Sequence, residues 1–226
     1  MSDSTQYCFY VDTTKCTGCK ACHISCKDRQ GDQIRSATKP VEDGVPTLNG
    51  VNWRRVYEYG GGSWNVDPNT GSYQQEVYAY YMSIGCNHCS EPVCVKACPT
   101  GAMHKRSEDG LVLVEESLCI ACESCARACP YDAPQLDQER KVMTKCDGCY
   151  ERLAVGRKPV CVESCPMRAI DFDTVENIVA KYGAGDSHIA PLPNQSLTSP
   201  NLIIKANRHG QGTTGGTGQI LNPTEV

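Results

Sequence analysis

The sequence predicts an α+β fold of short β hairpins and short helices, with a long insertion and an extended C-terminal tail. Two observations lead to this prediction. Short β-rich segments stand beside four cysteine-rich windows, numbered one to four along the chain, at residues 16–26, 86–98, 119–129 and 146–165. The 226 residues include 17 Cys but only 2 Phe and 2 Trp. A conventional apolar core would be thin at this composition, so something besides side-chain packing must help to hold the fold.

The strand beside each window makes an internal repeat of a strand, a cysteine-rich loop and a helical turn. Residues 174–183 are expected to form a helix, which Asp173 or Thr174 caps at its start and Gly183 ends. The β-rich segments predict strands at residues 6–12, 77–84, 111–114, 142–144 and 169–172.

Two regions lack cysteine altogether. Residues 31–75 are rich in Gly, Pro, Asn and Asp and predict an insertion with turns, for example at 42–44 and 67–71. Residues 184–226 are poor in apolar side chains and cannot offset their own ordering entropy. We therefore predict an extended interaction arm that lies on another protein, anchored by Leu202, Ile203 and Ile204, with a disordered tail as the alternative.

Composition excludes several classes. The net charge of −4 does not suggest nucleic-acid binding, which usually goes with a strongly basic surface. The sequence has no apolar run of about 18 residues, so no transmembrane segment of its own is expected. Residues 1–7 have neither the basic nor the apolar region of a signal peptide. Disulfide scaffolds are usually short secreted chains, which disfavours disulfides here.

The cysteine spacing points to iron–sulfur clusters. Windows one and three follow the C-x2-C-x2-C-x3-C run of bacterial ferredoxins, in which three cysteines bind one [4Fe–4S] cube and the fourth ligates the other cluster. Windows two and four keep the leading pair and the closing x3-Cys-Pro, with a longer loop before the third cysteine. In order, the windows are Cys16, Cys19, Cys22 and Cys26; Cys86, Cys89, Cys94 and Cys98; Cys119, Cys122, Cys125 and Cys129; and Cys146, Cys149, Cys161 and Cys165.

The crossing rule and the nested order of the windows pair window one with four and window two with three. This predicts four [4Fe–4S] clusters in two interlocked bacterial-ferredoxin-like modules: residues 1–30 plus 140–183, and residues 76–139. The predicted ligand sets are Cys16, Cys19, Cys22 and Cys165; Cys146, Cys149, Cys161 and Cys26; Cys86, Cys89, Cys94 and Cys129; and Cys119, Cys122, Cys125 and Cys98.

Zinc is the main alternative, but zinc sites use two Cys-x2-Cys pairs and do not call for a third close cysteine. Cys8 lies outside the windows and is expected to be a small buried apolar residue. No triad or phosphate loop is present, so we predict a non-catalytic conductor of single electrons whose cofactors carry the chemistry. Basic residues are expected to compensate cluster charge: Lys15, Lys20, Lys27, Lys96, Arg127, Lys145, Arg152 and Arg168.

Further motifs lie in and between the windows. Among them are Cys16-Thr17-Gly18-Cys19-Lys20, Arg54-Arg55-Val56-Tyr57-Glu58-Tyr59, Cys98-Pro99-Thr100-Gly101-Ala102-Met103 and Lys145-Cys146-Asp147-Gly148-Cys149-Tyr150. With these residues, the chain resembles the four-cluster iron–sulfur subunits of molybdopterin oxidoreductases over nearly its whole length. The segments between the cysteines favour the dimethyl sulfoxide reductase branch over the formate, nitrate and polysulfide branches. Residues 31–52 look longer than the usual connection.

The resemblance implies an electron-transfer subunit that works with a molybdenum bis-pterin catalytic subunit. It implies a membrane quinol-oxidising anchor or a multihaem cytochrome as electron donor. It also implies co-export with the catalytic subunit into a peripheral membrane complex, on the periplasmic side of the inner membrane or at the cell surface. A subunit of another molybdopterin oxidoreductase and a free-standing polyferredoxin stay open as alternatives.

Overall fold

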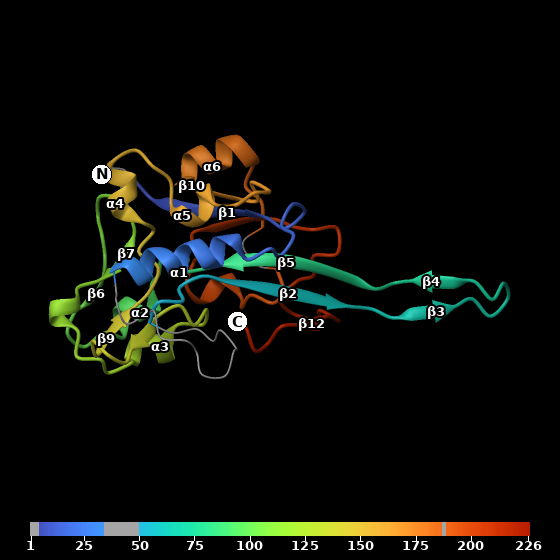
Figure 1. The fold of residues 1–226 in the computed structure, drawn as a ribbon, viewed down its shortest axis with the longest axis horizontal. Coiled ribbons are helices and arrows are strands. Elements are labelled where there is room, and N and C mark those ends of the chain that lie inside the picture. The colour runs from blue at the N-terminus through green and yellow to red at the C-terminus, as the bar shows by residue number, and fades with distance from the viewer. Residues whose placement is uncertain (1–4, 34–49, 187–188) are drawn as a thin grey trace.

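The computed structural model describes residues 5–33, 50–186 and 189–226 and shows a mixed helix and strand fold (Figure 1). A central sheet has the order β10–β1–β11. Strand β1 (Tyr7–Asp12) pairs antiparallel with β10 (Ile170–Thr174) and parallel with β11 (Leu202–Lys205). Buried residues of all three strands, among them Phe9, Phe172 and Ile204, pack in the main core.

A second sheet has the order β12–β2–β5. Strands β2 (Arg55–Gly61) and β5 (Tyr78–Ile84) form a long antiparallel pair, and β12 (Gln219–Ile220) joins its edge. The pair continues into a narrow hairpin of β3 (Trp64–Val66) and β4 (Tyr73–Gln75), which projects far from the body (Figure 1).

Two small hairpins and several short helices carry the cysteine windows. The hairpins are β6 (Met103–Lys105) with β7 (Val112–Val114) and β8 (Gln135–Asp137) with β9 (Val142–Thr144). The longest helix is α1 (Ala21–Gln33), and α6 (Val175–Tyr182) packs against β10 and β1. The others are α2 (Val93–Lys96), α3 (Ser124–Ala128), α4 (Tyr150–Ala154), α5 (Val160–Glu163) and two 3₁₀ turns at Glu116–Leu118 and Gln195–Leu197.

The α+β class and the strands beside the windows are confirmed. The helix prediction is also confirmed, because the Thr174 side chain accepts a hydrogen bond from the Asn177 N–H and Gly183 follows the last turn. Within the described residues, no helix has both the length and the apolar character needed to cross a membrane.

The region predicted as an insertion is more ordered than expected. Its described part contains β2, β3 and β4, so residues 55–75 belong to the second sheet and its hairpin rather than to a loop. The predicted turn at 67–71 is present, with the Gly71 N–H donating to the Asp67 carbonyl. The predicted turn at 42–44 lies outside the described residues.

The predicted anchor at Leu202, Ile203 and Ile204 is wrong in its partner. These residues form β11 and are buried against this chain's own β1 and core. The segment lacks apolar residues for a core of its own, but it completes a sheet whose other strands supply them. Whether the exposed parts of residues 184–226 act as an interaction arm stays a prediction.

Candidate iron–sulfur sites

One buried cavity is surrounded by cysteines from two windows. Cys86, Cys89 and Cys94 from window two line it together with Cys129 from window three. These four are one of the sets predicted from the spacing. The rest of its lining is mostly apolar, and Lys145 is the single charged residue that the described segments contribute to it.

A second cavity contains the reciprocal set. Cys119, Cys122 and Cys125 from window three line it together with Cys98 from window two. Helices α2 and α3 pack against each other and produce this exchange. Cys94 lies in α2 and lines the first cavity, whereas Cys98 follows that helix and lines the second. Conversely, Cys125 lies in α3 and lines the second cavity, whereas Cys129 follows that helix and lines the first.

The other two predicted sets also gather, around α1 and α5, which pack against each other. Burial raises the pKa of Cys16 to about 11, and the charges of Cys22, Cys165 and Cys19 add to that rise. Ser25 and Ser164, whose hydroxyls lie 2.7 Å apart, hold the two windows together beside these cysteines.

Cys26 lies with the three remaining cysteines of window four. Burial raises its pKa well above the ordinary value, and the charges of Cys146, Cys161 and Cys149 raise it further. All four of these thiols are buried. This set is therefore the one most completely shielded from water.

The four sets follow one another in a row. The charge of Cys161 raises the pKa of Cys22, which connects the first set to the wholly buried one. The charge of Cys86 raises the pKa of Cys146, which connects the buried set to the cavity of window two. Helices α2 and α3 connect that cavity to the last one. Each end of the row has a cysteine near solvent, Cys19 and Cys122.

Backbone N–H groups point at several of the sulfurs. Met103 N lies 3.4 Å from Cys98 Sγ, Met143 N lies 3.3 Å from Cys119 Sγ, and Ala169 N lies 3.3 Å from Cys165 Sγ. Such donors stabilise negative charge on sulfur, which both thiolates and cluster sulfides carry.

These residues fit [4Fe–4S] clusters. Each set supplies four soft thiolate donors, and no carboxylate or imidazole of the described part of the chain lines the two cavities. Among the described residues, no three His, Cys, Asp or Glu side chains converge closely enough for a single metal ion. Sulfurs spread around a cavity suit a group of several atoms better than one zinc ion.

The tail contributes to one site, which the sequence did not reveal. Thr198 is buried, lines the cavity of Cys86 and donates its hydroxyl proton to Tyr131. Backbone bonds from Ser90 and Glu91 to the carbonyls of Ser199 and Thr198 fix this segment against window two. A polar residue in a segment poor in apolar side chains carries no signal of such a role.

The basic residues expected to compensate cluster charge differ in their surroundings. Lys20, Lys96 and Arg152 pair with carboxylates at the surface. Two others lie at the cysteine sites. Lys145 is buried and its ammonium donates to the Val112 and Cys146 carbonyls, and the Arg127 guanidinium donates to the Cys122 carbonyl at 2.9 Å. The most deeply buried cation among the described residues is Arg54, which is not in the predicted group.

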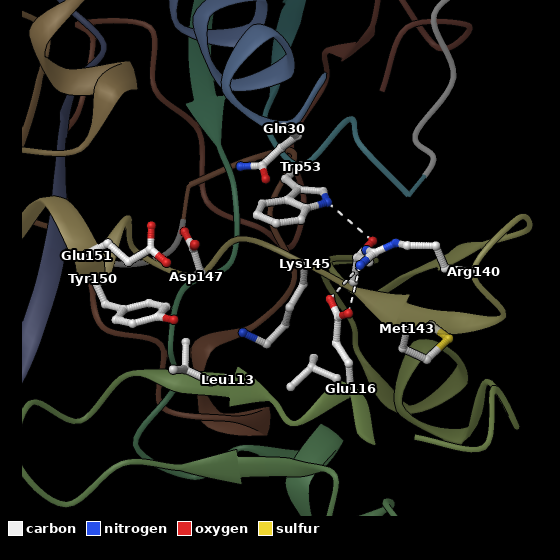
Figure 2. A pocket seen from close by; sticks show the side chains of 12 residues that line it. Gln30, Trp53, Leu113, Glu116, Arg140, Met143, Lys145, Asp147, Tyr150 and Glu151 are labelled. Atoms are coloured by element: carbon white, nitrogen blue, oxygen red, sulfur yellow. Dashed lines mark hydrogen bonds and ion pairs between the residues drawn. The ribbon is translucent and has the colours of Figure 1, made fainter. Parts of the chain in front are cut away.

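A polar cavity of about 300 Å³ lies beside the sites (Figure 2). Lys145 lines both this cavity and that of Cys86, and Met143 lines both this cavity and that of Cys98. Its wall carries Trp53 and the paired charges of Glu116 and Arg140 (Figure 2), but no cysteine. It therefore borders the cluster sites without being one.

The cysteine outside the windows behaves as predicted. Cys8 is buried in β1, and burial together with the negative charges of Asp173 and Asp171 raises its pKa to about 12. The thiol is therefore protonated at neutral pH and serves as a small apolar side chain.

Comparison with known proteins gives the same class. A family model described as a 4Fe-4S dicluster domain matches residues 77–175, and one described as a 4Fe-4S binding domain matches residues 13–30. The fold, the cysteine cavities and these matches define an iron–sulfur protein with ferredoxin-like [4Fe–4S] domains.

Relatives then identify the family. The chain is 48% identical over 223 residues to the B subunit of the anaerobic dimethyl sulfoxide reductase of Escherichia coli, covering 99% of this chain and 100% of that one. It is 38% identical to the B subunit of the sulfite dehydrogenase of Allochromatium vinosum, covering 76% and 70% of the two chains. It is 34% identical to the formate dehydrogenase-O iron–sulfur subunit of Escherichia coli, covering 74% and 53%. The chain belongs to the family of iron–sulfur B subunits of anaerobic dimethyl sulfoxide reductases.

Proposed function

We propose that this chain conducts single electrons through four [4Fe–4S] clusters, held by the four cysteine sets predicted from the spacing. The observation that carries this proposal is the gathering of all sixteen window cysteines into four groups of four that stand in a row. In this reading the chain has two interlocked ferredoxin-like modules, each of which exchanges one cysteine between its two sites.

A bound [4Fe–4S] cluster gains or loses one electron at a potential that its surroundings set. The protein's own part is to fix the clusters in sequence, to exclude water and to stabilise charge on sulfur. The apolar lining of the two cavities excludes water. The N–H groups of Met103, Met143 and Ala169 stabilise charge on sulfur.

The names of the relatives guide the choice of partner. We propose that the chain delivers electrons to a molybdenum bis-pterin catalytic subunit that reduces dimethyl sulfoxide, because the 48% identity to the dimethyl sulfoxide reductase subunit spans both chains almost fully. A membrane quinol-oxidising anchor or a multihaem cytochrome would supply the electrons. The complex would be peripheral to the membrane and exported with the catalytic subunit.

The direction of transfer follows from the same family likeness. The set with Cys16 and Cys19 would face the catalytic subunit, and the set with Cys98 and Cys122 would face the donor. Both are at the ends of the row, where a cysteine lies near solvent and short transfer distances to another protein are possible.

Iron analysis of the anaerobically purified chain tests the ligand assignment. About sixteen irons per chain, four for each cube, are expected; about eight would contradict the proposal. Size-exclusion chromatography of the native protein separates a complex with a large catalytic subunit from a free-standing polyferredoxin.

Cys122→Ser tests the direction in the assembled complex. Because this change damages the proposed donor-side site, reduction by the physiological donor should fail. Artificial dyes that reduce the catalytic subunit directly should still support turnover. Loss of both activities in a fully assembled complex would contradict the direction.

A further inference from the structure

The guanidinium of Arg54 is a buried cation that has no carboxylate partner among residues 5–33, 50–186 and 189–226. The residue is only 2% exposed, and no Asp or Glu in the described part of the chain forms an ion pair with it. An unpaired charge removed from water costs several kcal/mol as an order of magnitude, so a compensating negative charge is needed.

Cysteines from both sites of the first module (residues 1–30 plus 140–183) would supply that charge as cluster-bound thiolates. Burial lowers the pKa of Arg54, but the charges of Cys161, Cys22, Cys146 and Cys26 outweigh this effect and raise it above its ordinary value. Cys22 belongs to the set of Cys16, and the other three belong to the wholly buried set. Arg54 is therefore close to sulfurs of both sites, and the Ser83 hydroxyl connects its guanidinium to Cys22.

The rest of its surroundings holds the guanidinium in place. Nη1 donates to the carbonyl and the hydroxyl of Ser83, at 3.2 and 3.1 Å, and the Ser83 hydroxyl lies 3.1 Å from Cys22 Sγ. The guanidinium carbon lies 4.5 Å from the centre of the Phe9 ring, in a cation–π contact. Nη2 is buried and has no acceptor among the described atoms, so a donor is left for a further acceptor.

We propose that Arg54 is the shared counter-cation of the two clusters of the first module and raises the reduction potentials of both. This inference rests on the proposed ligand sets. A positive charge stabilises the reduced cluster, which carries one more electron, more than the oxidised one, so it favours reduction. A cation close to two clusters therefore raises the reduction potentials of both.

The test compares variants of the holoprotein by potentiometric titration monitored by electron paramagnetic resonance. Arg54→Met and Arg54→Gln should lower two of the four midpoint potentials, each by at least a tenfold change in the ratio of reduced to oxidised cluster at fixed potential, or about 59 mV for one electron. Arg54→Lys keeps the charge and should keep all four potentials near those of the wild type.

Arg208→Met is the matched control, because it removes the same charge from an exposed position where the guanidinium donates to His209. It should move none of the four potentials. Loss of clusters in the Met and Gln variants but not in the Lys variant also supports the proposal, since it shows that the cation is required. Equal behaviour of the Lys, Gln and Met variants, whether all four potentials are unchanged or the clusters are lost in each, overturns it.

The wild type decides separately whether the proposed function stands. Fewer than four midpoint potentials in the unmodified chain would contradict the four-cluster assignment. Four potentials in the wild type without a shift in Arg54→Gln would leave that assignment intact and reject the role of Arg54.

Discussion

Ile204→Ala is expected to destabilise this chain itself and not merely its contact with a partner. Ile204 is completely buried in β11, opposite Val11 of the parallel neighbour β1. Its backbone N–H and carbonyl also exchange two hydrogen bonds with Asp186. The strand is therefore part of the central sheet, although it lies in the segment with the weakest apolar pattern.

The size of the effect follows from the burial. Truncating a fully buried isoleucine to alanine removes its transfer free energy and leaves a cavity, together about 2–5 kcal/mol. A middle value of about 3 kcal/mol is reasonable because the side chain is enclosed by sheet residues that cannot collapse freely. If β11 is detached in the transition state, the whole loss accelerates unfolding, by roughly 100-fold at 1.4 kcal/mol for each factor of ten.

Loss of the visible absorbance of the clusters in denaturant, under strict exclusion of oxygen, measures this rate. A rate is the proper quantity because a protein that sheds its clusters does not unfold reversibly. Leu197→Ala is the matched control: it lies in the same tail, but its side chain is 56% exposed. It should change the free energy of activation by no more than about 0.5 kcal/mol.

One result would refute the reasoning. If Ile204→Ala loses its clusters at the wild-type rate while its affinity for the catalytic subunit falls, β11 serves the interface and not the sheet.

Two further predictions concern other parts of the structure. Gly18→Ala should deplete the Cys16 site of iron, because Gly18 has a φ of +70° and an added Cβ would lie 2.4 Å from a ring carbon of Tyr81. Gly101→Ala is the control. Gly101 has a similar φ of +73° but open space around it, so this change should leave the iron content unchanged. Asp171→Asn should lower the activation free energy of unfolding by about 1 kcal/mol or less, because the two lysines that pair with Asp171 are partly exposed. Burial alone would raise the pKa of Asp171, but hydrogen bonds from the lysines and a tyrosine outweigh burial and hold it below the ordinary value. The advantage of the wild type should therefore be constant above about pH 5 and should shrink as the pH falls below about 4, the ordinary carboxyl pKa; an advantage that grows in acid would contradict this assignment.

Spacing predicted which cysteines line each of the two cavities, because the spacing rule for cluster ligands reflects local geometry. Cys86 and Cys89 are three residues apart in one loop, so their proximity needs no knowledge of the rest of the fold. The crossing of Cys98 and Cys129 involves distant windows, yet it follows from the same local rule applied twice. The helix that Thr174 caps was predictable for a similar reason, since caps and periodicity are properties of neighbouring residues.

The missed features depend on contacts between segments far apart in sequence. Nothing near Leu202 indicates that β11 pairs in parallel with β1, because the apolar face it needs is supplied about 190 residues earlier, at Phe9 and Val11. Arg54 lies outside every cysteine window, and an arginine before a strand is ordinarily a surface residue. Only the packing of α1, α5 and β5 around it makes it a buried neighbour of the sulfurs.

The x3 spacing before each closing cysteine has a structural cause in these short helices. In α2 and α3, a single helical turn carries one cysteine toward the near cavity, and the cysteine just beyond its end reaches the neighbouring one. Helices of four or five residues do not form alone, because nucleation costs more than so few bonds return. Ligation at both ends of such a helical turn would hold it in place, and the turn would orient its two cysteines toward the two neighbouring cavities. The scarcity of large apolar residues in this sequence then follows, since the cofactors stabilise segments that side-chain packing alone would leave unfolded.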